Sequence, residues 1–182
     1  MVTFGQIMLQ TTWVLYTYFR FGWTTLDNGI ALFCVGLSAA VVQAALLGWL
    51  IKRLGEVRLS MLGLASGAVV YMLYGLATHG WMMYVLILCN LLAFAAGPAL
   101  QGIVSKRTDP REQGALMGSL QSLASLAMVV VPGIGALLLA RVSILPANDW
   151  RIGITFFVSA ILQTTALIVA WRYFAKHPVA KT

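Results

Sequence analysis

The chain has 182 residues, of which 60% are hydrophobic and 9% are charged, and its mean hydropathy is +0.88. A soluble domain carries about a quarter charged residues, so this composition excludes a water-soluble globule and indicates a protein of the lipid bilayer. The formal net charge of +7 would suggest a nucleic-acid partner for a soluble protein. Basic loops have a different use in membrane proteins, and no nucleic-acid partner is expected here.

Charged residues divide the chain into apolar tracts of membrane-spanning length. A helix needs about 20 apolar residues to cross the hydrocarbon, and four tracts fit one crossing each. A fifth tract, 59–105, is long enough for two and has a polar turn at Thr78–Trp81. Barrel-like alternation is absent, and helices satisfy their own backbone in lipid. The sequence predicts one all-α membrane domain, 1–182, with six transmembrane helices at 3–20, 28–51, 58–77, 81–104, 114–139 and 151–173.

Basic residues are distributed unevenly between the two sets of loops. The links after the second and fourth helices, with the C-terminal tail, hold nine Lys and Arg residues, and the other links hold Arg20, Arg141 and Arg151. Positive loops face the cytoplasm, which predicts a multi-pass protein of the bacterial inner membrane with both termini cytoplasmic. Arg20, Asp27 and Asp149 are expected near the opposite face, paired in water. The nine are Lys52, Arg53, Arg58, Lys106, Arg107, Arg111, Arg172, Lys176 and Lys181.

The stretch "GWLIKRLGEVRL", Gly48–Leu59, concentrates charge between two uncharged runs. Gly48 would allow close helix approach, and Gly55 would allow a left-handed turn in a very short link. The basic side chains Lys52, Arg53 and Arg58, with Glu56, would then sit at a cytoplasmic helix end, where cations favour the negative end of the helix dipole. Two interpretations stay open: a latch between two conformations, or a topology anchor only.

This stretch resembles the loop motif of major facilitator transporters, in its degenerate second copy. "LATHGWMM" (76–83) and "GPALQGIVSKRTDPREQGALMGSLQSLASL" (97–126) are similar to the second half of the tetracycline/proton antiporters. The resemblance covers almost the whole chain and maps its helices onto helices seven to twelve of the family. It implies one half-bundle of the major facilitator fold, with the N-terminal half absent.

The function implied by this resemblance is proton-coupled export of a hydrophobic, tetracycline-like drug by alternating access. Its implied partners are that substrate, free or as a metal chelate, together with protons, the lipid bilayer and an N-terminal six-helix half. The alternative is a standalone six-helix membrane protein that acts as a homodimer or a non-transporting scaffold. No enzyme activity, cofactor or metal site is expected, because His79 and His177 fall on opposite faces and no catalytic constellation is present. No carboxylate lies in the middle of a helix.

Amide side chains inside the apolar tracts are the candidate cavity residues. Each needs a partner or water, so each either lines a wet cavity or joins two helices. The family's cavity helices correspond to the first, second, fourth and fifth helices here. The resemblance therefore favours Gln10, Gln43, Asn90 and Gln121, together with Ser125 on the fifth helix, and it disfavours Gln163, which falls on a peripheral helix. Gln6 and Gln101 are disfavoured because they lie nearer the cytoplasmic ends of their helices.

The predicted helix 114–139 carries two further signals. Gly114, Gly118, Ser122 and Ser125 form a small-residue stripe that would permit close helix packing. Pro132 removes a backbone hydrogen bond and is expected to bend the helix, with Gly133 and Gly135 beside it. The bend is interpreted either as a hinge for alternating access or as a static kink.

Overall fold

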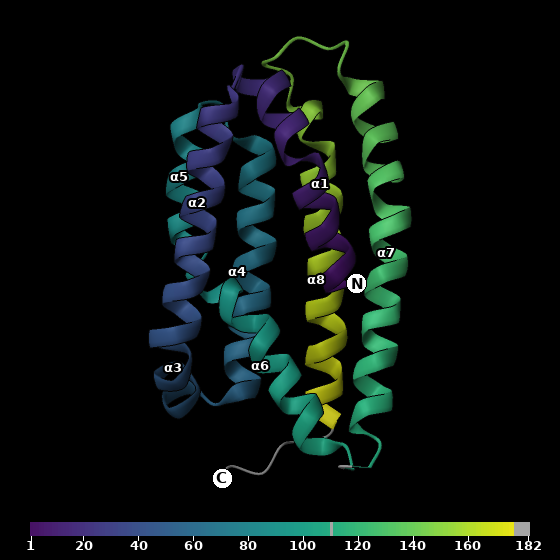
Figure 1. Ribbon diagram of the computed structural model, residues 1–182. Coiled ribbons are helices and arrows are strands. Elements are labelled where there is room, and N and C mark those ends of the chain that lie inside the picture. The colour runs from purple at the N-terminus through teal and green to yellow at the C-terminus, as the bar shows by residue number, and fades with distance from the viewer. Residues whose placement is uncertain (110, 177–182) are drawn as a thin grey trace.

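The computed structural model describes residues 1–109 and 111–176. The predicted cytoplasmic Lys181 and the tail residue His177 lie outside the described residues. The described part is helical, and the helices run roughly along one common axis (Figure 1). In chain order they are α1 (Val2–Phe21), α2 (Thr25–Val41), the π-helical turn η1 (Val42–Leu46), α3 (Leu47–Leu54), α4 (Glu56–Leu76), α5 (Gly80–Cys89), α6 (Leu91–Arg107), α7 (Gln113–Val142), the 3-10 turn η2 (Trp150–Gly153) and α8 (Ile154–Lys176).

Most of these segments are long and apolar enough to cross a membrane. In the described part, four continuous segments qualify, namely α2 to α3, α4, α7 and η2 to α8. The pair α5 and α6 qualifies as a fifth span if the two are counted together. The fold is therefore an all-α membrane fold, as predicted. Helix α1 carries more polar residues, and its crossing stays a prediction.

Two predicted helices are less regular than the sequence suggested. The range 81–104 is not one straight helix: α5 and α6 meet at Asn90 with a bend of 44°, and Asn90 has φ −87° and ψ 18°. Asparagine is a weak helix former because its side chain competes for backbone hydrogen bonds. The range 28–51 contains the π-helical turn η1, which the charge pattern could not indicate.

Glycines of α4 allow that helix to pack closely against both α6 and α8. A Cβ atom on Gly63 would lie 2.5 Å from the carbonyl oxygen of Leu92 on α6. One on Gly67 would lie 2.9 Å from Nε2 of Gln163 on α8. Lipid supplies no hydrophobic force between helices, so van der Waals contact at small residues drives their association. The close-packing seam of this bundle therefore lies on α4.

The predicted small-residue stripe on α7 has no such role within this chain. Cβ atoms on Gly114 and Gly118 would meet nothing within 4 Å. The hydroxyls of Ser122 and Ser125 are exposed and donate to carbonyls of their own helix, at 2.9 and 3.0 Å. Close approach on α7 instead occurs at Gly135, where a Cβ would lie 2.6 Å from the Thr12 methyl carbon on α1.

An aromatic cluster fills the core near the end of the bundle where α1 ends. Trp13 makes edge contacts with Trp23, Tyr74 and Phe156, with ring centroids 5.4 to 6.2 Å apart. Trp23 is buried and stacks on Tyr84 at 5.1 Å. Trp23 lies at a helix end, where tryptophans of an interfacial aromatic belt are common, but its ring packs inside the protein. Trp81, Trp150 and Trp171 are exposed, as belt residues would be.

Arg20 joins three segments at this same end. Its Nε donates to the carbonyl of Ala77 at 3.1 Å, and its Nη1 donates to the carbonyls of Ala147 and Asp149 at 2.7 and 2.6 Å. The side chain is only 8% exposed. The expectation that Arg20 pairs with carboxylates in water is wrong, because the ends of α4 and of the α7–α8 link supply backbone acceptors around it.

Replacing Arg20 by Met should destabilise the bundle by about 2 kcal/mol, because hydrogen bonds to a charged group contribute about 1.5–3 kcal/mol. Unfolding of the purified protein in mixed detergent, followed by circular dichroism, measures the change. Arg141→Met removes an exposed Arg at the same end and should change stability by less than about 0.5 kcal/mol. Equal losses in the two variants would contradict a special role for Arg20.

Candidate functional site

The loop predicted from Gly48–Leu59 folds into a single-residue link between α3 and α4. Gly55 has φ 77° and ψ 156°, a combination essentially restricted to glycine. Its amide still donates to the carbonyl of Ile51 at 2.9 Å. A side chain at this position would strain the link, so Gly55 sets the sharp reversal from α3 to α4.

Glu56 connects the start of α4 to the end of α6. Its Oε1 accepts a hydrogen bond from Nζ of Lys106 at 2.7 Å. The two side chains form an ion pair, the single one that the described residues contain. Gly102 leaves room for the carboxylate, because a Cβ there would lie 3.3 Å from Glu56 Oε1. Nε2 of Gln113, at the start of α7, donates to the Ser105 hydroxyl. One end of the bundle is therefore tied from α4 through α6 to α7.

The remaining members of the predicted loop do not join this network. Lys52, Arg53 and Arg58 are exposed, and no ion pair involves them within the described part of the chain. Gly48 is also exposed, and a Cβ on it would meet nothing within 4 Å. The prediction that Gly48 permits close helix approach within this chain is wrong.

The predicted cavity residues lie at two depths rather than in one cluster. At 1.5 Å per residue, Gln10 and Asn90 lie about 15–16 Å from the end of the bundle that holds Arg20. On the same basis Gln43, Ser125 and Gln121 lie about 26–31 Å from that end. Gln10, Gln43, Gln121 and Ser125 are exposed. The structure therefore separates a middle pair from a deeper group on α2 to α3 and α7.

Asn90 differs from the other candidates because this chain itself buries it. It is 5% exposed at the α5–α6 break, and its Oδ1 has no hydrogen-bond partner. Gln163, which the resemblance disfavoured, is buried on α8, and its Oε1 is also without a partner. These two amides are interior groups of the bundle. They are not surfaces of a cavity open to a ligand.

Helix α7 runs through Pro132 without interruption from Gln113 to Val142. Gly133 faces open space, whereas Gly135 is a packing position against Thr12. The three residues thus do not act alike: Gly135 fixes α7 on α1, and Pro132 with Gly133 lies on a more exposed side. Whether α7 bends during a functional cycle stays a prediction.

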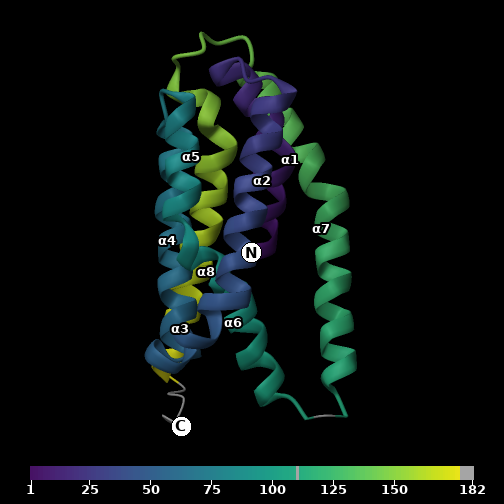
Figure 2. The same ribbon diagram turned by 60° about the vertical axis from the view of Figure 1, so that its left-hand side comes forward.

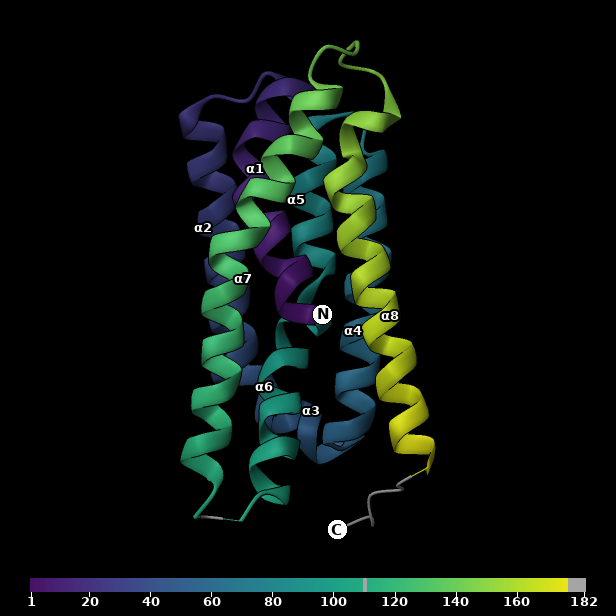
Figure 3. The ribbon, with the colours of Figure 1, turned by 90° about the vertical axis from the view of Figure 1, so that its right-hand side faces the viewer.

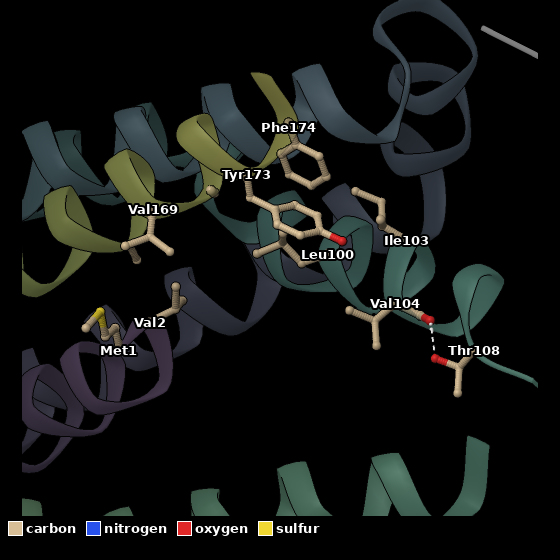
Figure 4. A pocket seen from close by; sticks show the side chains of 11 residues that line it. Met1, Val2, Leu100, Ile103, Val104, Thr108, Val169, Tyr173 and Phe174 are labelled. Atoms are coloured by element: carbon tan, nitrogen blue, oxygen red, sulfur yellow. Dashed lines mark hydrogen bonds between the residues drawn. The ribbon is translucent and has the colours of Figure 1, made fainter. Parts of the chain in front are cut away.

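An apolar cavity of about 530 Å³ lies between the start of α1, α6 and α8 (Figure 4). Tyr173 and Phe174 of α8 project toward Leu100 and Ile103 of α6, and Thr108 donates to the carbonyl of Val104 at 2.8 Å. None of the predicted amides lines this cavity. The exposed predicted residues, Gln10, Gln43, Gln121 and Ser125, therefore belong to a different surface.

Sequence reasoning missed two irregular points that adjoin candidate residues. Gln43 lies inside the π-helical turn η1, and such turns are frequent at functional sites. Asn90 marks the α5–α6 break. Gly63-x-x-x-Gly67 on α4 was also overlooked, although that spacing is a known signal for close helix packing.

Comparisons with known proteins agree on one family. The whole chain, residues 1–182, matches the Major Facilitator Superfamily. It is 36% identical over 172 residues to the class G tetracycline resistance protein of Vibrio anguillarum. The matched region covers 94% of this chain and 42% of that relative. The class B protein of Escherichia coli is 33% identical, with 91% of this chain and 41% of the relative covered.

A more distant relative is multidrug resistance protein 2 of Bacillus subtilis, 29% identical with 75% of this chain and 34% of the relative covered. No solved structure gives a significant match. The chain spans about two fifths of the length of the tetracycline resistance proteins it matches. Because the family match extends from the first residue to the last and agrees with an all-α membrane fold, the chain belongs to the Major Facilitator Superfamily.

Proposed function

We propose that the chain forms the C-terminal six-helix half of a proton-coupled efflux transporter that exports a hydrophobic, tetracycline-like drug by alternating access. The observation that carries this proposal is its similarity to tetracycline resistance proteins along 94% of its length. Alternating access in this fold rocks one bundle against another around a site near the bilayer midplane.

Uneven burial supports a second bundle as partner. In the most apolar stretch of each span, only 17% of α2 to α3 and 22% of α7 is buried, against 50% of α4. Helices α2 and α7 lie on either side of α1 in Figure 2, and Figure 3 shows both toward the left of the bundle, away from α8. Gln43 and Gln121 are exposed on these sparsely covered helices, and an amide facing lipid would lack a partner. A wet cavity between two bundles would satisfy both.

Proton coupling needs a titratable group within the membrane. All five carboxylates of this chain, Asp27, Glu56, Asp109, Glu112 and Asp149, lie in links or in the first turn of a helix. Asp27 closes a capping box with Thr24, and Asp149 caps η2. In our proposal the N-terminal half supplies the proton carrier. This chain supplies part of the drug cavity and part of a cytoplasmic gate, which is the α3–α4 link with its Glu56–Lys106 ion pair.

Orientation follows from the basic residues. The ends of α3, α6 and α8 lie together at one end of the bundle (Figure 1), and they carry Lys52, Arg53, Lys106 and Lys176. The positive-inside tendency supports this end as cytoplasmic. We propose an inner-membrane location with both termini on the cytoplasmic side.

The first test of the proposal is functional complementation. The chain alone should give no drug efflux, whereas co-expression with the N-terminal six helices of the class G protein should restore part of it. Uptake of tetracycline into inverted vesicles, with and without an uncoupler, measures transport. Uncoupler-sensitive uptake by this chain alone would favour the homodimer and contradict the half-transporter.

The cavity makes a second prediction. In the co-expressed pair, Gln43→Cys and Gln121→Cys should react with a water-soluble thiol reagent in at least one transport state, because both positions are exposed on the chain. Gln163→Cys serves as the control and should stay unreactive, because Gln163 is buried against Gly67 of α4. Mass spectrometry of the labelled protein reads out both. If neither Gln43→Cys nor Gln121→Cys reacts, these amides join helices and do not line a cavity.

A third prediction concerns the Glu56–Lys106 ion pair of the proposed gate. Glu56→Gln removes the ion pair with Lys106, which at this partly exposed position contributes about 0.2–1 kcal/mol. In the assembled transporter the cycle rate should change about two- to fivefold while drug binding stays within twofold. Exchanging the charges, Glu56→Lys with Lys106→Glu, should restore much of the rate. Glu112→Gln, at the same end, is the control, and unchanged transport in Glu56→Gln would leave this loop as a topology anchor only.

A further inference from the structure

Helix α3 has two chemically opposite faces. Leu47, Leu50, Ile51 and Leu54 pack into a cluster with buried residues of α4 and α6. On the other side Trp49 is 54% exposed, and Lys52 and Arg53 are exposed beside it. The helix thus lies on the bundle and directs an indole and two cations away from it.

The π-helical turn before α3 explains why this face points outward. A π-turn holds about one residue more than an α-turn, so it rotates the side chains that follow by about 100° relative to a regular helix. Val42, inside the turn, is fully buried. The turn therefore allows one continuous segment to place Val42 and then Leu47 in the core while Trp49 and Arg53 face outward.

The exposed cations have no anionic partner within the described residues. Glu56 is the one carboxylate of the stretch, and Lys106 already occupies it at 2.7 Å. The guanidinium of Arg53 lies over the Trp49 ring at 5.1 Å, a contact that leaves its positive charge uncompensated. Arg58 lies in the first turn of α4 and is also exposed. Three cations and one indole thus gather at one end of the bundle.

We propose that Trp49, Lys52, Arg53 and Arg58 bind the phosphate headgroup of an anionic phospholipid. Indoles favour the boundary between headgroups and acyl chains, so Trp49 fixes the depth of the neighbouring cations at the phosphate level. Basic side chains at a membrane surface attract anionic lipids, and each Lys or Arg raises the affinity about fivefold. Arginine and lysine both bind phosphate well, and an arginine stacked on an indole keeps its N–H edge available.

This inference depends on the membrane location of the chain and not on drug transport. A free anion would use the same cations but would gain nothing from Trp49. The exposed ring therefore favours a lipid over a soluble phosphate. A docking surface for a protein partner would instead be insensitive to lipid composition.

Native mass spectrometry of the purified full chain, titrated in detergent with phosphatidylglycerol or phosphatidylcholine, tests the site. The wild-type chain should bind phosphatidylglycerol at least tenfold more tightly than phosphatidylcholine. The triple variant Lys52→Gln, Arg53→Gln, Arg58→Gln should lose about tenfold to a hundredfold in affinity for phosphatidylglycerol only. Trp49→Leu should lose about two- to fivefold. Binding of phosphatidylglycerol should weaken as salt is raised from 0.1 to 0.5 M.

Matched variants separate the site from net charge. Arg141→Gln with Arg151→Gln removes two exposed cations at the opposite end and should leave binding unchanged. The charge-conserving pair Lys52→Arg with Arg58→Lys should also keep it, and Arg58→Gln alone, with helical content checked by circular dichroism, should lose about fivefold. Equal losses in the triple variant and the Arg141/Arg151 control would overturn the proposal. So would equal binding of the two lipids, or displacement of phosphatidylglycerol by millimolar inorganic phosphate.

Discussion

Close backbone contact along α4 is the constraint on which the rest of this bundle depends. Between apolar helices in lipid, association rests on van der Waals contact and interhelical hydrogen bonds, so the helix backbones approach most closely where side chains are small. Gly63 brings α6 against α4, and Gly67 admits the Gln163 side chain of α8. Near the other end of α4, the Phe157 ring of α8 lies where a Cβ on Gly75 would stand. With α6 and α8 fixed in this way, α1 packs on α8 and α7 packs on α1.

A consequence of this order is that coverage falls from one side of the bundle to the other. Helix α4 lies between two neighbours, whereas α2 and α7 have much of their surface uncovered. The polar residues follow the same gradient: Gln163 is interior, and Gln43 and Gln121 are exposed. The charged residues around the α3–α4 link are likewise divided between a covered side and an uncovered side. Glu56 turns inward to Lys106, and the cations turn outward, so one charged stretch divides into two surfaces with different chemistry.

The charge pattern located the apolar segments, because charge is expelled from lipid, but it did not mark the break between α5 and α6 at Asn90. The sequence was also insufficient for the helix faces. Gly114 and Gly118 are spaced like a packing stripe but face open space, whereas Gly63 and Gly67, with the same spacing, carry the seam. Spacing identifies a possible contact surface, and only the neighbouring helix decides whether it is used. Prediction of the site residues was limited for a related reason. The sequence located the amides on helices, but the bend at Asn90 and the start of each helix determine how deep each amide lies in the bundle.

Arg20 also has a consequence for the order in which the protein is assembled. Its backbone acceptors at Ala147 and Asp149 lie 127 and 129 residues farther along the chain. At a synthesis rate of about 5–20 residues per second, the ribosome needs about 6–25 s to make them after Arg20 has emerged. During that interval Nη1 of Arg20 lacks both acceptors, and within the described residues only the carbonyl of Ala77, 57 residues farther along, can accept from the guanidinium. Closure of this end is therefore a late event of biogenesis, completed only when the last link has been translated.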